Sequence, residues 1–115
     1  MEISENKVDN IIVVSLGGRI DSTAAVEFEE KLIKYVDAGA RTMVVDFQKV
    51  QFISSAGLRV LLLAAKKVKP YGGKIILSGM SKDVREVFDI SGFSSIFEIH
   101  DDQTSAVNAA KKIVT

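Results

Sequence analysis

The pattern of apolar and polar positions changes period most clearly between residues 41 and 69. Apolar side chains dominate from Met43 to Phe47, which predicts a buried strand. After Ser54 and Ser55 the apolar residues recur three and four positions apart, which predicts an amphipathic helix carrying Leu58, Leu61, Leu62, Ala65 and Val68 on its inner face. The two serine hydroxyls therefore lie where a strand gives way to a helix.

Before this stretch, the pattern predicts a hairpin and one helix. A short polar strand (residues 2–7) and a β-branched strand (residues 10–16) are joined by a tight turn, and Gly17-Gly18 is expected to end the second strand. A helix follows as far as Gly39, with Asp21 or Ser22 as its cap. Its inward stripe is predicted to be Ala25, Phe28, Leu32 and Val36.

After this stretch, strands and helices continue to alternate. Residues 74–78 and 96–99 are predicted strands, and a helix between them begins at Ser81 and stops at Ser91-Gly92. The last helix is capped by one of Asp101, Asp102 and Thr104. The predicted order is ββαβαβαβα. Helical crossovers favour a parallel sheet and the hairpin makes it mixed, so we expect a single α/β domain over residues 1–115.

Composition excludes several classes of function. The chain of 115 residues has 15 basic and 15 acidic side chains, so no cationic field attracts nucleic acid or a membrane surface. It has no cysteine and one histidine, which excludes disulfides, thiol nucleophiles and clustered His or Cys metal ligands. No signal peptide or membrane span is apparent. We expect a soluble, cytoplasmic protein without a cofactor or metal.

No catalytic constellation stands out. His100 is alone, and Ser54-Ser55 lacks the flanking glycines of a G-x-S-x-G elbow. Asp21 and Asp46 could approach each other at one end of the sheet, but a capping role for Asp21 and a solvated strand end for Asp46 are favoured. A receiver domain with Asp46 as phosphoacceptor is disfavoured because its N-terminal acid pair is missing. The sequence therefore predicts a protein that is not an enzyme.

The serine pair suits a switch that acts on binding. One hydroxyl at a helix start serves as the N-cap, worth about 1 kcal/mol, while the other points outward. A phosphate added there brings about −1.5 to −2 charges and is favoured by the helix N-terminus. A docked partner surface tolerates it less, since unit charges ~4 Å apart interact by about 4 kcal/mol at an effective dielectric of 20. Phosphorylation could therefore end binding without changing the fold.

These residues also resemble a known family. The segment from Phe52 to Leu61, preceded by Val44-Val45-Asp46-Phe47, resembles the core of STAS domains (sulfate transporter and anti-sigma factor antagonist). The likeness extends over nearly the whole chain, through Gly18-Arg19-Ile20-Asp21, Gly73-Lys74-Ile75-Ile76-Leu77 and residues 87–93. A free-standing domain of this length looks like a bacterial anti-sigma factor antagonist.

The resemblance implies partner switching. The unphosphorylated antagonist would bind an anti-sigma factor that is also a serine kinase, releasing the sigma factor, and a serine phosphatase would reset the phosphorylated form. The family's acceptor stands two residues before a Gly-Leu pair, which here is Ser55, with Ser54 as the alternative. The partner-binding residues implied are Asp21, Asp46, Ser54, Ser55, Ala56, Gly57, Leu58 and Arg59.

Some alternatives remain open at this level. Gly57 either admits a close partner surface or packs against the neighbouring strand. Arg59 is either solvated or in contact with the partner or phosphate. A STAS scaffold or accessory subunit of a transport or stress-signalling complex is the alternative function, and a pull-down from the host that recovers a permease or large scaffold would support it.

Overall fold

The computed structural model describes residues 1–114, in which five strands and four α-helices follow the predicted order. Short 3-10 turns follow α2 and α3, at Lys69–Tyr71 and Phe93–Ser95. The elements are β1 (Glu2–Val8), β2 (Ile11–Ile20), α1 (Ser22–Asp37), β3 (Thr42–Ile53), α2 (Ser55–Val68), β4 (Lys74–Ser78), α3 (Lys82–Ser91), β5 (Glu98–His100) and α4 (Gln103–Val114).

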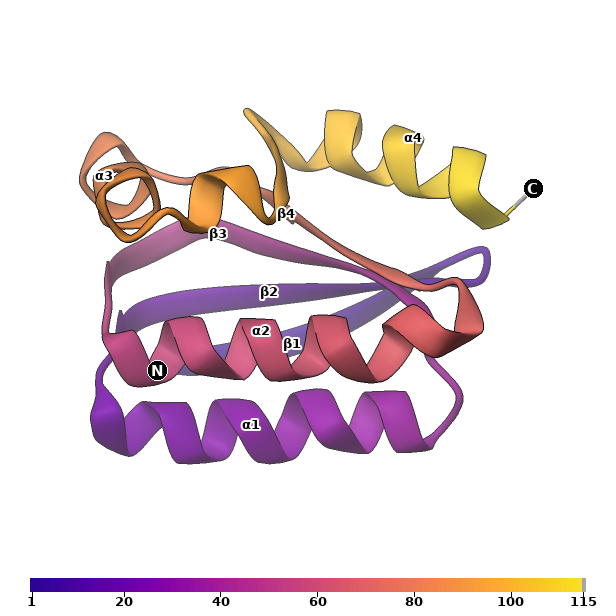
Figure 1. Ribbon diagram of the computed structural model, residues 1–115, viewed down its shortest axis with the longest axis horizontal. Coiled ribbons are helices and arrows are strands. Elements are labelled where there is room, and N and C mark those ends of the chain that lie inside the picture. Colours follow the sequence, from indigo (N-terminus) through magenta and orange to yellow (C-terminus); the bar gives the residue numbers. More distant parts are fainter. Residues whose placement is uncertain (115) are drawn as a thin grey trace.

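The strands form one mixed sheet in the order β1-β2-β3-β4-β5. β1 pairs with β2 in antiparallel orientation, and the other three pairings are parallel. Each parallel pairing is connected through a helix, as the predicted crossovers require. Figure 1 shows α1 and α2 running side by side, with their first residues at the same end of the molecule. The predicted mixed, mostly parallel sheet is confirmed.

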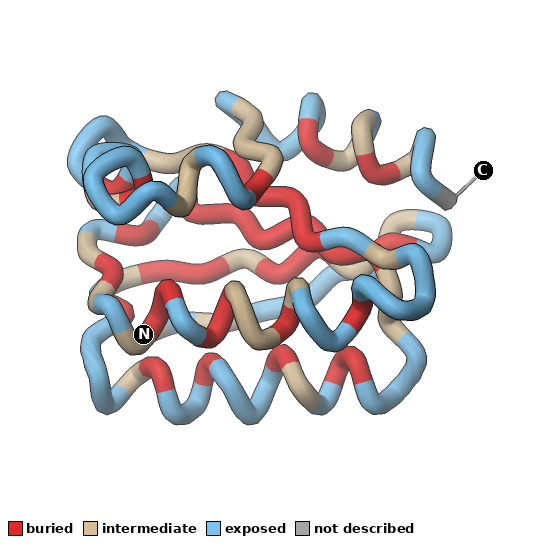
Figure 2. The backbone as a smooth tube through the Cα atoms, viewed as in Figure 1, coloured by how far each residue is buried: buried red, intermediate tan, exposed pale blue. Residues whose placement is uncertain are grey.

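Each face of the sheet carries its own apolar core. The larger core joins β2, β3 and β4 to α1, α2 and α3, and its fully buried side chains include Phe28, Phe47 and Phe88. On the other face, Ala106 and Ala110 of α4 pack on Ile11, Val13, Val44 and Ile76. Figure 2 shows these buried positions concentrated in the central strands and on the inner sides of α1 and α2. Within residues 1–114, no helix has the length and apolar character needed to cross a membrane.

The second strand does not end at the glycine pair, so this part of the prediction was wrong. β2 continues through Gly17 and Gly18 to Ile20, with register shifts against β3 on both sides of the pair. Gly18 adopts φ +82°, a conformation that glycine accepts without a steric penalty. The glycines therefore form an irregularity within the strand. As a result, β2 and β3 extend together beyond the β3–β4 ladder, whose last pair is Asp46 with Ser78.

The edge strand β5 is shorter and later than predicted. It spans Glu98–His100, because residues 93–95 form a 3-10 turn and leave Ile96 outside the ladder. The last helix is capped by Asp102, whose carboxylate accepts the Ser105 amide at 2.8 Å. Ser81 caps α3 as predicted, accepting the Val84 amide at 3.2 Å.

Glu98 of β5 links this edge strand to its neighbour β4 and makes stability depend on pH in the acid range. Its carboxylate accepts from Lys74 Nζ at 2.6 Å and lies 2.6 Å from His100 Nε2. The hydrogen bond from Lys74, followed by that from His100, lowers the pKa of Glu98 below its ordinary 4.5. A lowered pKa in the folded state adds stability above the ordinary pKa, and this stability is lost as pH falls through the folded-state pKa.

We therefore expect Glu98→Gln to be less stable than the wild type at pH 7, by at most about 1 kcal/mol because the pair is partly exposed. The difference between the two proteins should shrink as pH falls toward the lowered pKa, which urea unfolding at pH 7 and pH 3 would measure. Glu29→Gln, at an exposed position on α1, is the matched control. A difference of the same size at both pH values would contradict this prediction.

Candidate functional site

The starts of α1 and α2 lie next to each other at one end of the sheet. Ile20 and Ile53, the last residues of β2 and β3, are paired neighbours in the sheet. The Ser54 amide donates to the Ile20 carbonyl at 2.8 Å, so the ladder continues to the first residue before α2. Asp21 and Ser54, the two N-cap residues, are consequently placed side by side.

Ser54 is the cap of α2. Its backbone is extended (φ −84°, ψ 167°), and its Oγ accepts the Gly57 amide at 3.2 Å. Asp21 serves α1 in the same way, since its Oδ1 accepts the Ala24 amide at 2.8 Å. The predicted roles of Asp21 and of the serine pair in capping are confirmed. Ser54 is half-buried, and its hydroxyl is engaged by its own helix.

Ser55 is the first residue of α2, and its side chain is exposed. A helix N-terminus carries roughly half a positive charge and unpaired N–H groups. Two such termini point to the same end of the molecule, and neither first turn contains an acidic side chain. Asp21, in the cap position of α1, is a negative charge beside this site. The geometry suits an added anion on Ser55.

The residues after Ser55 divide into a packed side and an outer side. Gly57 and Leu58 are buried, Ala56 is half-buried and Arg59 is exposed. A Cβ on Gly57 would lie 2.8 Å from Ile53 Cγ1 and 3.0 Å from Ile20 Cγ2. Gly57 therefore allows α2 to approach the ends of β2 and β3 closely, which favours the packing interpretation of this glycine.

Arg19 is a residue of this region that the sequence analysis did not select. Its guanidinium lies 4.4 Å from the centroid of the Phe52 ring, a cation–π contact between paired residues of β2 and β3. Arg19 is exposed and is two residues before Asp21. The only sequence signal for Arg19 is its position in the segment Gly18-Arg19-Ile20-Asp21, which resembles STAS domains. Its stacking on Phe52 depends on the register of β2 against β3, which a local pattern does not give.

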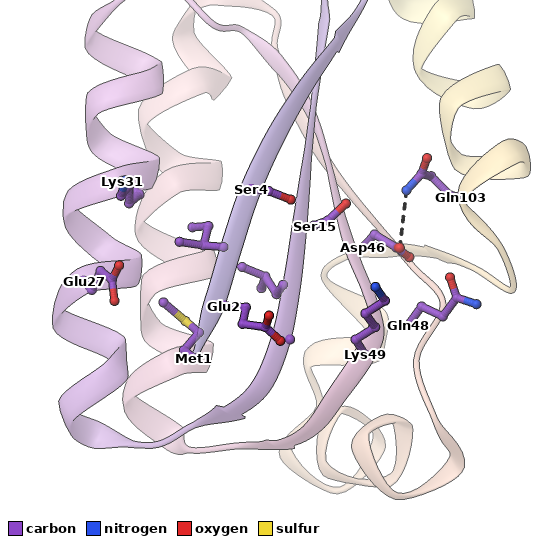
Figure 3. A pocket seen from close by; sticks show the side chains of 13 residues that line it. Met1, Glu2, Ser4, Ser15, Glu27, Lys31, Asp46, Gln48, Lys49 and Gln103 are labelled. Atoms are coloured by element: carbon purple, nitrogen blue, oxygen red, sulfur yellow. Dashed lines mark hydrogen bonds between the residues drawn. The ribbon is translucent and has the colours of Figure 1, made fainter.

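Asp46 lies elsewhere, and the expectation of a solvated strand end was wrong. Its residue is only 6% exposed, and it sits inside β3 between Ser15 of β2 and Ser78 of β4. Its carboxylate accepts from Ser78 Oγ at 2.9 Å and from Gln103 Nε2 at 3.3 Å, as Figure 3 shows for Gln103. Asp46 thus ties the first residue of α4 to the sheet.

The carboxylates of Asp21 and Asp46 are far apart. Asp21 follows Ile20, whose partner Ile53 is seven residues beyond Asp46 on β3 (53 − 46 = 7), a separation of about 20 Å along the strand. They cannot act as an acid–base pair. No group of three or more His, Cys, Asp or Glu side chains within residues 1–114 is arranged to hold a metal ion.

A polar hollow of about 740 Å³ lies beside Asp46 and is shown in Figure 3; neither Asp21 nor Ser54 nor Ser55 lines it. Acidic and basic side chains both line it, including Glu2, Lys49 and Lys31. Asp46 at its wall is already bonded to Ser78 and Gln103. The group of exposed residues that the sequence analysis selected, Asp21, Ser55 and Arg59, belongs to the helix starts and not to this hollow.

Comparison with known proteins agrees with this fold. The family model for the STAS domain matches residues 2–106. BtrV of Bordetella bronchiseptica, a candidate anti-sigma factor antagonist, is 40% identical over 111 residues, covering 96% of each chain. The anti-sigma-B factor antagonist of Bacillus subtilis is 31% identical over 99 residues, covering 86% of this chain and 88% of its own.

Solved structures share the architecture. The unphosphorylated form of the anti-sigma factor antagonist SpoIIAA superposes with a TM-score of 0.85 at 24% identity, covering 99% of this chain and 100% of SpoIIAA. The phosphorylated form of the Bacillus protein superposes with a TM-score of 0.74 at 23% identity, covering 94% and 98%. With the family model matching nearly its whole length, this chain belongs to the STAS domain family.

Proposed function

We propose that this protein is an anti-sigma factor antagonist that binds its anti-sigma factor when Ser55 is unmodified and releases it when Ser55 is phosphorylated. The observation that carries the proposal is that Ser55 is exposed at the first position of α2, beside a second helix start. The relatives at 40% and 31% identity are named as anti-sigma factor antagonists, which supports the choice of partner.

Ser55 is a better acceptor than Ser54 for a structural reason. The Ser54 hydroxyl caps α2 and is half-buried, so a phosphate on it would disturb the contact with the Gly57 amide. The Ser55 side chain is exposed, and a phosphate on it is favoured by the helix N-terminus. Structures of SpoIIAA have been solved in the unphosphorylated and the phosphorylated form. This supports the proposal that the shared fold accepts a phosphate.

The partner surface we propose surrounds Ser55. Asp21 and Arg59 are exposed on the two adjacent helices, and Ala56 is partly exposed between them. Leu58 and Gly57 are buried and support this surface from below. The partner is an anti-sigma factor with serine kinase activity, and a serine phosphatase resets the switch.

Incubation with ATP and the anti-sigma kinase of the same genome tests the proposal. Intact-mass analysis should show one added phosphate on the wild type and none on Ser55→Ala. Ser54→Ala is the matched control: it should still accept phosphate, although it loses about 1 kcal/mol of stability with its cap. Phosphate on the Ser55→Ala variant would move the acceptor to Ser54, and an unmodified wild type would contradict the switch itself.

A further inference from the structure

A groove of about 410 Å³ lies at the opposite end of α2 from Ser55. It exists because β5 is short: its ladder with β4 begins at Ile76, so the two residues before Ile76 have no β5 neighbour. The C-terminal half of α2 forms the other wall. The residues lining it are Leu62, Ala65, Lys66, Lys69, Gly73, Lys74, Ile75, Ile96 and Phe97.

The floor of this groove is apolar. Ile75 and Phe97 are buried, and Leu62 and Ala65 are half-buried beside them. Ile96 is 56% exposed at the rim, although it is a large aliphatic side chain. An apolar occupant that covers Ile96 removes its exposed apolar surface from water, which favours binding.

The rim is cationic. Lys66, Lys69 and Lys74 are exposed around the floor, and no carboxylate is among the lining residues. Lys74 is paired with Glu98, which leaves Lys66 and Lys69 facing an occupant. Lys66 also offsets the negative end of the α2 dipole, but Lys69 lies beyond the last residue of that helix.

We propose that this groove docks an acidic amphipathic segment of a partner protein, whose apolar side chains fill the floor and whose carboxylates meet Lys66 and Lys69. Amphipathic helices bind apolar grooves in this way, through side chains at i, i+3, i+4 and i+7. An anionic membrane fits less well, because the surface is concave and membrane-binding clusters contain about 4–8 basic residues.

This surface is independent of the proposed switch. Lys66 is eleven residues after Ser55 (66 − 55 = 11) on α2, which places it about 16 Å along the helix axis. That is about twice the Debye length of ~8 Å at physiological salt. A partner docked in the groove can therefore stay bound while Ser55 is phosphorylated and dephosphorylated.

A synthetic helical peptide with leucines at i, i+3, i+4 and i+7 and glutamates elsewhere is the probe. Titrated into the full chain, it should shift the NMR amide signals of Ile75 and Phe97 and bind more weakly as salt increases. The matched peptide with lysines in place of the glutamates should bind at least about tenfold more weakly. Equal binding of the two peptides, or no binding of the acidic one, would overturn the proposal.

Two substitutions test whether the peptide binds in the groove or at another exposed apolar position. Ile96→Asp should weaken binding of the acidic peptide at least about tenfold, because it places a carboxylate on the rim. Ile90→Asp, at a position that is 79% exposed and outside the groove, should leave it unchanged. Unchanged binding by Ile96→Asp would contradict the proposed site. Binding of the protein to phosphatidylserine vesicles is measured for comparison. If the protein bound these vesicles but not the acidic peptide, the proposal of a protein partner would be contradicted.

Discussion

Replacing Ser55 with aspartate should weaken binding to the anti-sigma factor more than tenfold while leaving the fold intact. Ser55 is exposed at the first position of α2, where a negative charge adds about 0.3–1 kcal/mol of stability through the helix dipole. In the complex with the anti-sigma factor, the same carboxylate would lose its hydration or lie close to charged groups of the partner. Two unit charges ~4 Å apart interact by about 4 kcal/mol at an effective dielectric of 20. Half of that energy is still more than the roughly 1.4 kcal/mol that corresponds to a tenfold change in affinity.

Isothermal titration calorimetry with the purified anti-sigma factor measures the affinity, and urea unfolding measures the stability. Thr104→Asp is the matched control, because it adds the same charge to the exposed first turn of α4, which lies on the other face of the sheet. We expect Thr104→Asp to bind as the wild type does. Wild-type affinity of Ser55→Asp would rule out an electrostatic switch, and a loss of stability would point to an effect on the fold.

Replacing Asp46 with alanine should cost about 2–4 kcal/mol of folding free energy. The substitution removes the acceptor of Ser78 Oγ, whose residue is fully buried, and the acceptor of Gln103 Nε2 at the start of α4. Hydrogen bonds to charged groups contribute about 1.5–3 kcal/mol, and an unsatisfied buried hydroxyl costs about 1–3 kcal/mol. Because domains of this size are stable by about 5–15 kcal/mol, the effect is large.

The midpoint of urea unfolding measures this loss, with Gln48→Ala as the control at an exposed position of the same strand. The folded Asp46→Ala protein should still accept phosphate on Ser55 at the wild-type rate, since Asp46 lies about 20 Å from the helix starts along the sheet. A variant that is stable but no longer binds the anti-sigma factor would instead support the partner-binding role that the family resemblance implies for Asp46.

The sequence predicted those parts of the site that depend on local signals. A change from strand to helical period marks the start of α2, and residue type at a helix start limited the caps to Asp21 or Ser22 for α1 and to one of Ser54 and Ser55 for α2. The resemblance to STAS domains added the choice of Ser55. The irregularity at Gly17-Gly18 escaped local reasoning, because the same glycines that often end strands also permit a continued, irregular pairing.

The sequence by itself therefore determined the order of the elements, the mostly parallel sheet and an exposed serine at the start of α2. Only the tertiary structure decided that Asp21 is a neighbour of Ser54, that Asp46 is buried against Ser78 and Gln103, and that a cationic groove separates α2 from Ile96. The physical reason is that period and capping act within a few residues. Strand register and crossover packing instead bring together residues that are about 30 to 60 positions apart in the sequence. A local pattern carries no information about the distance between such residues.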